Sequence, residues 1–472
     1  MLIGRINEQK RLKKALLSDE SEFVAVYGRR RVGKTYLIRE TFGYQFTFSH
    51  IGLAKKNTRE QLKNFQSSLR KQGLPKAVLP KNWFEAFDLL ETLVKQSKDK
   101  KKVIFIDELP WMDSPKSGFV TAIEHFWNSF ASARKDIVFI VCGSATSWII
   151  KKILKNKGGL HNRITIRIHL NQFTLNECEQ YAQTLRLGMT HRQLMECYMV
   201  MGGVPYYWSL LDSEKSLAQN IDYLFFSKYG ELRNEFSELY ASLFKNPEKY
   251  ISIIEALGQK KVGMTREEIV KEGKIPYNGN VSVLLDELES CGFIRKYTTI
   301  GHKNKNAVFQ LIDQYTLFYY KFIHNNPVND PQFWSKSLDK PIYNNWCGLA
   351  FERLCLLHSR QIKEALGVAG VISSEYAWRI DGNKEEKGAQ IDLLIDRGDD
   401  VINLCEMKFT KRPFKIDSAY DEILKNKLSR FIDSTKTRKA VRITMITSNP
   451  LVQNSYASDL PNQITAEELF RP

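Results

Sequence analysis

The sequence GRRRVGKT at residues 28–35 directly follows an apolar run at residues 23–27. This order matches the G-x-x-x-x-G-K-[ST] pattern of a phosphate-binding loop that leaves a strand and enters a helix. Glycines at both ends of such a loop let the backbone turn tightly, so that successive N–H groups point toward phosphate oxygens at the start of the helix. The pattern therefore predicts a nucleotide-binding site on an α/β domain.

The eight loop residues are expected to bind the nucleotide. Lys34 would reach the β- and γ-phosphates, and the hydroxyl of Thr35 would be a ligand of Mg²⁺. The expected cofactors are therefore ATP and Mg²⁺. The full set of loop residues is Gly28, Arg29, Arg30, Arg31, Val32, Gly33, Lys34 and Thr35.

A second apolar run at residues 103–106 ends in Asp107 and Glu108. Asp107 is expected to hold Mg²⁺, directly or through water, and Glu108 to orient the attacking water. One carboxylate for the metal and one for the water suits phosphoryl transfer, which depends on positioning and charge neutralisation. The alternative is an ordinary acidic helix cap after a strand.

A third apolar run, residues 137–142, is followed by Gly143 and Ser144. By its similarity to P-loop ATPases of the AAA+ type, Ser144 is expected to sense the γ-phosphate. Arg163 lies where this class often carries an arginine finger, supplied by the same or a neighbouring subunit. A homo-oligomer is therefore possible, and a solvated loop arginine is the alternative.

The net charge of +17 over 472 residues favours an anionic partner, with nucleic acid the first expectation and a merely basic surface the alternative. The length predicts two to four domains. Seven cysteines without a C-x-x-C pair indicate a reducing compartment. No run approaches the ~18 apolar residues of a membrane span, so we expect a cytoplasmic protein without membrane contact.

The pattern along the chain predicts four parts. Residues 1–170 alternate strands and helices, which indicates a parallel sheet in a P-loop ATPase core, and the helical residues 171–240 resemble an AAA+ lid. Residues 246–313 predict three short helices and a hairpin, the order of a winged-helix domain. Its third helix is acidic (Asp286, Glu287, Glu289), so a protein-contacting role is as plausible as DNA reading, and the better nucleic-acid surface is a basic wing of Arg295, Lys296, His302, Lys303 and Lys305.

Residues 390–396 and 401–409 predict a β-hairpin in the fourth part, residues 340–472. A turn centred near residues 398–399 places Asp392 opposite about residue 405, beside Glu406. Asp392 and Glu406 could then bind a metal ion, with Lys408 orienting or deprotonating water for phosphodiester hydrolysis and Glu352 as a further acid. The arrangement resembles PD-(D/E)XK nucleases, with Ile-Asp in place of Pro-Asp; a cross-strand ion pair is the alternative.

Nearly the whole chain resembles the archaeal-type P-loop ATPase family, AAA+- or STAND-like, with a DEXX-box ATPase C-terminal domain. The motifs that carry the resemblance occur in the family's order. The motifs are Ile3-Gly4-Arg5 with Glu8, GRRRVGKT, IDELPWM at 106–112, CGSATSWI at 142–149, GGVPYY at 202–207, FERLC at 351–355, QIDLLID at 390–396 and CEMKF at 405–409. The resemblance implies that Gly4 and Arg5 lie near the adenine pocket.

The expected fold class is α/β, with an AAA+-like parallel sheet and lid, a winged-helix middle domain and an α/β nuclease-like C-terminal domain. We expect an ATP-binding, Mg-dependent ATPase that acts on or binds DNA, with the ATP state gating the C-terminal domain. The alternative is a STAND-like nucleotide switch whose C-terminal domain is catalytically inactive and binds nucleic acid or protein.

Overall fold

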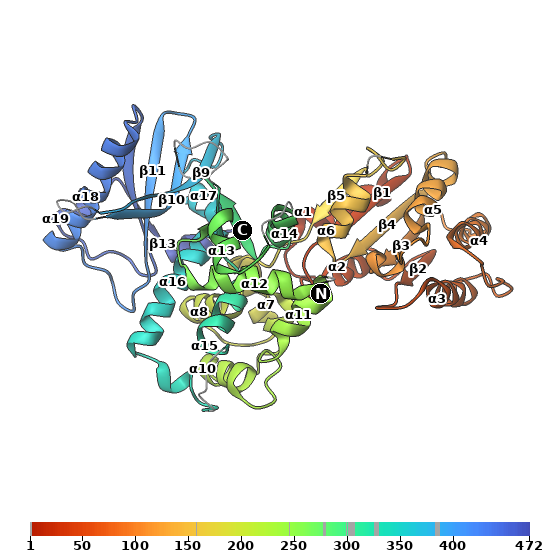
Figure 1. Ribbon diagram of the computed structural model, residues 1–472, viewed down its shortest axis with the longest axis horizontal. Helices are drawn as coiled ribbons and strands as arrows, with labels where there is room; N and C mark the ends of the chain where they lie inside the picture. The colour runs from red at the N-terminus through yellow and green to blue at the C-terminus, as the bar shows by residue number, and fades with distance from the viewer. Residues whose placement is uncertain are drawn as a thin grey trace. The chain divides into compact units, whose positions relative to one another are not determined.

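The computed structural model describes residues 2–156, 158–244, 246–276, 280–298, 300, 307–324, 330–382 and 388–472. The chain divides into two compact units. The first consists of Met1–Asn171 with Ser242–Lys245, and the second of Gln172–Ala241 with Asn246–Pro472. Figure 1 labels the helices and strands of both units. Within the described residues, no helix is long and apolar enough to cross a membrane.

The first unit is built on a parallel five-stranded sheet, which confirms the α/β class. The strand order is β2-β3-β4-β1-β5, and all the neighbouring strands run parallel. The strands are β1 (Glu22–Tyr27), β2 (Phe48–Ile51), β3 (Lys102–Asp107), β4 (Ile137–Gly143) and β5 (Ile166–His169). The central strands read as continuous apolar runs because helices cover both faces of a parallel sheet.

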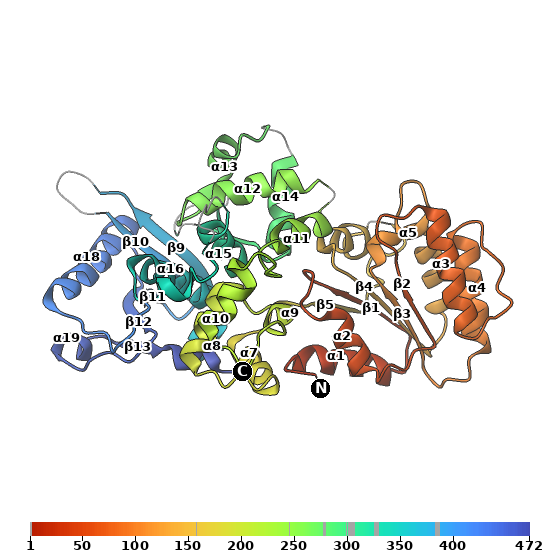
Figure 2. The ribbon, with the colours of Figure 1, turned by 90° about the horizontal axis from the view of Figure 1, so that it is seen from below.

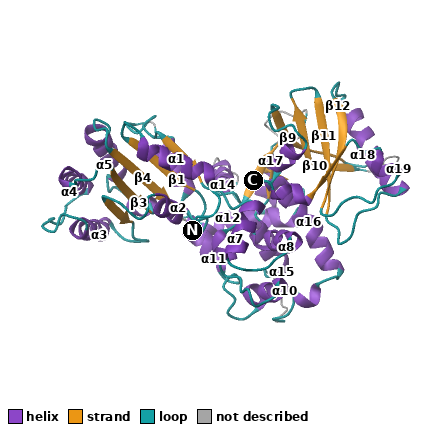
Figure 3. Ribbon diagram, turned by 180° about the vertical axis from the view of Figure 1, so that it is seen from behind, coloured by secondary structure: helices purple, strands orange, loops and turns teal. Residues whose placement is uncertain are grey.

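Alternate residues of β1 separate the two cores of this unit. Val24 and Val26 pack with α1 (Ile6–Leu17) and α2 (Lys34–Thr41), while Phe23 and Ala25 face the opposite core. That second core is closed by α3 (Thr58–Lys71), α4 (Trp83–Gln96) and α5 (Phe119–Phe126). Figure 3 shows the strands between these two helical layers.

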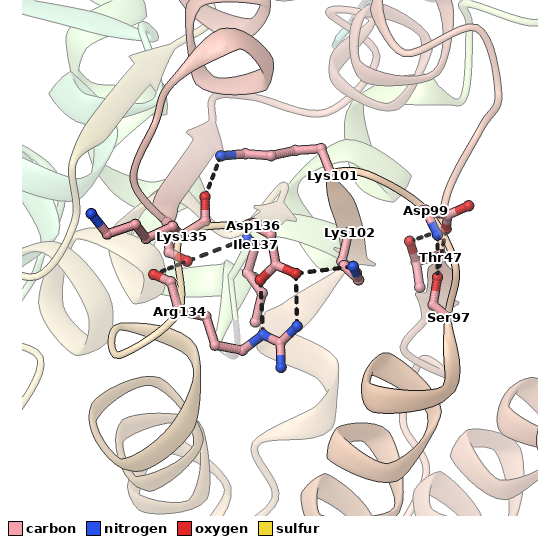
Figure 4. Close-up of polar contacts among 10 residues, drawn as sticks. Thr47, Ser97, Asp99, Lys101, Lys102, Arg134, Lys135, Asp136 and Ile137 are labelled. Carbon is pink, nitrogen blue, oxygen red and sulfur yellow. Dashed lines mark hydrogen bonds and ion pairs between the residues drawn. The ribbon is translucent and has the colours of Figure 1, made fainter.

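Polar contacts tie together the amino ends of the strands (Figure 4). Lys101 donates from Nζ to the carbonyls of Ser18, Glu20 and Lys135 at 2.6, 2.9 and 2.8 Å. Asp136 accepts two hydrogen bonds from Arg134, at 2.8 and 2.7 Å, which holds its carboxyl pKa down at about 2. These contacts close this edge of the sheet and leave the carboxyl edge for loops.

The second unit begins with helices and no strands up to residue 241, as the pattern predicts. The apolar pattern predicts helices at 175–185, 191–201 and 217–229, and α7 (Leu175–Thr184) and α8 (His191–Met201) match the first two within a residue. The predicted helix at 217–229 is shorter: α10 (Leu217–Ile221) continues as a π-helical turn, Asp222–Phe226. The helices of residues 172–241 belong to the same compact unit as the C-terminal part of the chain.

The middle segment contains the three predicted helices and two predicted strands, with one short strand in addition. The Thr-x-x-Glu pattern at residues 265–268 predicts a capping box, and Thr265 and Glu268 form it. The strands pair antiparallel in the order β6-β8-β7. The elements are α12 (Pro247–Gln259), β6 (Met264–Thr265), α13 (Arg266–Glu272), α14 (Asn280–Ser290), β7 (Ile294–Tyr297) and β8 (Val308–Leu311). His302, Lys303 and Lys305 lie outside the described residues.

The C-terminal segment forms a mixed sheet in the order β13-β12-β11-β10-β9. The strands β9, β10 and β11 are antiparallel neighbours, and β11, β12 and β13 are parallel neighbours. The helix α18 packs on the sheet through Phe431 (Figure 2). The elements are α16 (Pro341–Leu357), β9 (Ser373–Ile380), β10 (Ala389–Arg397), β11 (Val401–Lys408), α18 (Ser418–Thr435), β12 (Ala440–Thr447) and β13 (Asn462–Thr465).

Candidate nucleotide site and C-terminal carboxylates

The three predicted nucleotide motifs meet at one edge of the first sheet. The strands β3, β4 and β1 are adjacent and parallel, so their carboxyl ends lie side by side. Gly28 follows β1, the Asp107–Glu108 pair closes β3, and Ser144 follows β4. Ligands of open α/β sheets bind outside the carboxyl ends of the strands, so this edge is where a nucleotide belongs.

The phosphate-binding loop has the backbone that its glycines predict. Gly28 has φ 150° and Gly33 has φ 89°, both unfavourable for residues with a side chain. A Cβ on Gly28 would lie 2.2 Å from the carbonyl oxygen of Leu170, so the loop passes directly against the segment after β5. The helix α2 begins at Lys34, which brings its first N–H groups to the end of the loop.

The ammonium of Lys34 is held inside the loop. Its side chain is buried, and Nζ donates to the carbonyls of Gly28 and Arg29 at 2.9 and 2.8 Å. A third hydrogen bond reaches the hydroxyl of Ser144 at 3.3 Å. The loop cation and the residue after β4 are therefore in direct contact.

The carboxylates after β3 continue this network. Thr35 Oγ1 donates to Asp107 Oδ2 at 2.7 Å, and the Glu108 N–H donates to Asp107 Oδ1 at 2.9 Å. Ser144 donates to Glu108 from its hydroxyl at 2.8 Å and from its backbone N–H at 3.3 Å. Glu108 has φ 47°, a left-handed conformation that is typical of functional sites when a residue has a side chain.

The neighbouring hydroxyl of Thr35 and carboxylate of Asp107 fit Mg²⁺, which prefers hard oxygen ligands and retains several waters. The other predicted site residues differ in placement. Val32 is buried in the core, so only its backbone can serve the nucleotide. Arg5 is buried and donates to the carbonyl of Asn171 at 2.6 Å, next to Gly4. Arg163 lies in a turn with an exposed side chain, and its role as an arginine finger stays a prediction.

A family described as an ATPase domain predominantly from Archaea matches residues 2–211. This segment is similar to that ATPase domain and contains the phosphate-binding loop at residues 28–35. The match includes the whole sheet of the first unit together with α7 and α8.

Three known proteins are similar to longer parts of the chain. An uncharacterized protein of Methanocaldococcus jannaschii is 24% identical over 368 residues, which cover 75% of this chain and 76% of the relative. A Walker-type ATPase of Pyrococcus abyssi has a TM-score of 0.47 and 15% identity, covering 68% of this chain and 96% of the other. The ORC2 protein of Aeropyrum pernix, in ADPNP–ADP complexes, has a TM-score of 0.38 and 17% identity, covering 66% and 91%.

The C-terminal hairpin is confirmed, but its register differs by one residue from the prediction. Leu393, not Asp392, lies opposite Cys405. The three residues 398–400 form the connection, and Asp400 has φ 60°, as in three-residue hairpin loops that end in a left-handed residue. The described pairing with β11 ends at Leu393, and the register of β10 against β9 shifts between Ile391 and Leu394, so strand alternation does not by itself place Asp392 opposite Glu406.

Glu406 is surrounded by groups that donate to it. Its Oε1 accepts from the Tyr420 hydroxyl at 2.9 Å and lies 3.4 Å from the ammonium of Lys408. Its Oε2 pairs with Lys427 at 2.6 Å. Burial and the nearby Glu406 carboxylate raise the pKa of Tyr420, so this phenol is a hydrogen-bond donor at neutral pH.

Glu352 lies with a different cation. Lys261, in the loop after α12, donates from Nζ to Glu352 Oε1 at 2.9 Å. Burial, together with the negative charge of Asp392, raises the pKa of Glu352. Asp392 itself accepts a hydrogen bond at Oδ1 from Gln390 at 2.8 Å. Glu352 therefore lies close enough to Asp392 to be affected by its negative charge, and Glu406 lies beside Lys408.

The part of the chain that the structure describes contains no group of three or more His, Cys, Asp or Glu side chains that could hold a metal ion. The metal-binding and catalytic roles of Glu352, Asp392, Glu406 and Lys408 stay predictions. The residues that sequence reasoning missed are Lys261, Tyr420 and Lys427. The position of Lys427 could have been predicted, because it lies about one helical turn after the apolar Leu424 and therefore on the side of α18 that faces the sheet.

Arg295 is turned into the protein, contrary to the expectation of an exposed basic wing. Its guanidinium donates to the side-chain oxygen of Gln310 at 2.6 Å and to the carbonyl of Asp392 at 3.1 Å. It also lies 4.7 Å from the ring centroid of Tyr297. Burial lowers its pKa to about 10. Of the wing residues that are described, only Lys296 is exposed.

Proposed function

We propose that the chain binds ATP with Mg²⁺ and hydrolyses the γ-phosphate. The observation that carries this proposal is the continuous hydrogen-bond network from Thr35 through Asp107, Glu108 and Ser144 to Lys34. The network joins the residue types that phosphoryl transfer requires, at the edge of the sheet where a nucleotide would lie.

Each side chain of the network has a distinct role in this mechanism. Thr35 and Asp107 would hold Mg²⁺, whose charge offsets that of the phosphates. Lys34 binds the β- and γ-phosphates, and Glu108 orients the attacking water. Ser144 accepts from Lys34 and donates to Glu108, so it links the cation that touches the phosphate to the carboxylate that aims the water.

The test separates binding from hydrolysis. Lys34→Ala should weaken ATP binding by about 10- to 100-fold, because a charge-assisted contact is worth about 1.5–3 kcal/mol. Glu108→Gln should retain ATP affinity and lower hydrolysis by about 10²- to 10⁴-fold. Glu91→Gln, on the surface helix α4, is the matched control and should behave as wild type. Wild-type turnover by Glu108→Gln would refute the assignment.

We further propose that the ATP state controls a C-terminal part that acts on nucleic acid in the cytoplasm. In this proposal residues 1–170 are the ATPase core, 171–240 its lid, 246–313 a winged-helix domain and 340–472 a nuclease-like domain. The net charge of +17 supports an anionic partner. The order α16, β9, β10, β11, α18 and β12 supports the nuclease-like arrangement.

A second candidate is a nucleotide switch whose C-terminal domain binds nucleic acid without cutting it. It is favoured by the ion pairs that Lys261 and Lys427 form with Glu352 and Glu406. DNA affinity measured at several salt concentrations, with and without ATP, tests both candidates. Each phosphate contact steepens the slope of log binding constant against log salt concentration by about 0.9. A binding constant that does not change with salt would contradict nucleic-acid binding. Cleavage with Mg²⁺ or Mn²⁺ that Asp392→Asn abolishes would favour the nuclease.

A further inference from the structure

We propose that Lys261 and Lys427 are internal counter-ions of Glu352 and Glu406, in the positions that a divalent cation would take in a metal-dependent hydrolase. The inference rests on the proposed function only for the nuclease-like character of the C-terminal segment. The nuclease resemblance assigns roles to Glu352 and Glu406 but none to Lys261 or Lys427.

The contacts of Glu406 leave little of its carboxylate for a metal ion. The ammonium of Lys427 lies 2.6 Å from Oε2. The Tyr420 hydroxyl donates to Oε1 at 2.9 Å, and the ammonium of Lys408 lies 3.4 Å from the same oxygen. Glu406 is 12% exposed and Lys427 is 20% exposed, so the pair is shielded from water. A buried carboxylate needs a compensating cation, and here Lys427 provides the closest one.

Lys427 and Tyr420 come from the same helix and approach Glu406 together. They are seven residues apart on α18, which is two helical turns, so both side chains lie on one face of the helix. The helix itself is fixed to the sheet by Phe431 and Leu424. The ammonium is therefore delivered to Glu406 by packed secondary structure rather than by a surface loop.

Lys261 reaches Glu352 from the loop after α12, and its side chain is 50% exposed while that of Glu352 is 16% exposed. The backbone carbonyl of Lys261 accepts from Arg353 at 2.5 Å and from the Gln310 side chain at 2.9 Å. Arg353 is the helical neighbour of Glu352, and it is 1% exposed. The contact thus fixes the backbone of Lys261 to α16 while its side chain pairs with Glu352 at 2.9 Å.

The remaining predicted ligand does not restore a metal site. Asp392 accepts from Gln390, and no cluster of three metal-binding side chains exists among the residues that the structure describes. Mg²⁺ retains several waters and needs only one or two carboxylates, but Glu352 and Glu406 each already have an ammonium group, at 2.9 and 2.6 Å. Both oxygens of Glu406 are therefore paired, whereas Glu352 is paired through Oε1 alone and its buried Oε2 has no hydrogen-bond partner within the part of the chain that the structure describes.

The test measures Mn²⁺ binding to the full-length, nucleotide-free protein by calorimetry. Lys427→Met and Lys261→Met keep the length of the side chain and remove the charge. Lys425→Met, whose side chain pairs with Asp421 on the same helix, and Lys260→Met, which pairs with Glu268, are the matched controls. Each of the two test variants should bind Mn²⁺ about tenfold more tightly than wild type, because the carboxylate no longer has to give up a charge-assisted contact, and the controls should not.

Second substitutions locate the gained site. Glu406→Gln in the Lys427→Met background and Glu352→Gln in the Lys261→Met background should abolish the gain. Thermal unfolding is an independent measurement: Mn²⁺ should restore the Tm that each variant loses, without raising that of wild type.

Three outcomes would overturn the inference. The first is wild-type Mn²⁺ binding that Glu352→Gln or Glu406→Gln weakens, which the single carboxylate variants reveal even if the lysine variants do not fold. The second is an unchanged Mn²⁺ affinity in both lysine variants. The third is an equal gain in the controls. ATP binding and turnover in the same samples test the proposed ATPase separately, so failure of one does not imply failure of the other.

Discussion

Replacing Gly28 by alanine should destabilise the first unit more than replacing Gly33, although both glycines belong to the same motif. At Gly28 the new Cβ would lie 2.2 Å from the carbonyl oxygen of Leu170, closer than the 3.0 Å below which neighbouring atoms must move. Leu170 has little freedom to retreat, because its N–H donates to the carbonyl of Tyr27 at 2.7 Å. At Gly33 no atom lies within 4 Å of the new Cβ.

The difference in free energy of unfolding follows from these two environments. Both positions have positive φ, which costs about 1–3 kcal/mol for alanine. Only Gly28 adds the cost of overpacking, about 1–3 kcal/mol. Gly28→Ala should therefore be about 2 kcal/mol less stable than Gly33→Ala. For a domain of this size that is roughly 4–8 °C in Tm.

Thermal unfolding with and without ATP provides the assay. The transition that ATP shifts to higher temperature in wild type belongs to the first unit. Gly348→Ala, a helical glycine with no atom within 4 Å, is the control and should leave that transition unchanged. Equal losses of Tm for Gly28→Ala and Gly33→Ala would refute the steric argument.

Three further predictions concern side chains. Ser144→Ala should lower ATP hydrolysis about tenfold with ATP affinity little changed, because it removes the hydrogen bond to Glu108; unchanged turnover would contradict the link. Asp136→Asn should lower the free energy of unfolding at pH 7 by about 1–2 kcal/mol. Because Arg134 holds the Asp136 pKa at about 2, below its unfolded value, this stabilisation is present above about pH 4 and is lost as the pH falls toward 2, so the difference in urea unfolding should shrink near pH 3. Burial lowers the pKa of His191, but hydrogen bonds to two glutamates outweigh it and raise the pKa. The resulting stabilisation is present below about pH 6.5 and is lost as the pH rises through the folded pKa. His191→Gln should therefore lower Tm more at pH 5.5 than at pH 9. An effect that does not change with pH would show that His191 gains no stability from pairing with the two glutamates.

The arrangement of the candidate nucleotide site was predictable because its parts are local. The motif at residues 28–35, the Asp107–Glu108 pair and Ser144 each follow an apolar run, and each run became a strand of the parallel sheet. Parallel strands place their carboxyl ends together, so knowing the strands was enough to bring the motifs to one edge. The contact from Ser144 to both Lys34 and Glu108 was not predictable, since it depends on β4 lying between β1 and β3.

The C-terminal carboxylates show the limit of the same reasoning. The hairpin of β10 and β11 was predictable, but the pairing of Leu393 with Cys405 and the irregularity of β10 between Ile391 and Leu394 were not. Arg295 was expected in solvent and is turned inward to Asp392, 97 residues along the chain. The charge pattern of a strand does not reveal what will pack against it.

Short-range pattern thus accounts for the strand–loop–helix of the nucleotide site, the capping box at Thr265 and the alternation that divides the two cores of the first sheet. These features depend on residues a few positions apart, whose relative geometry follows from helix and strand periods. Tertiary structure alone brings Lys261 to Glu352, 91 residues away, and Lys427 to Glu406, 21 residues away. Such pairs form where separate elements pack. The position of a charge in the sequence therefore suggests a chemical group, and only the packing decides whether its partner is a metal ion, a phosphate or another side chain.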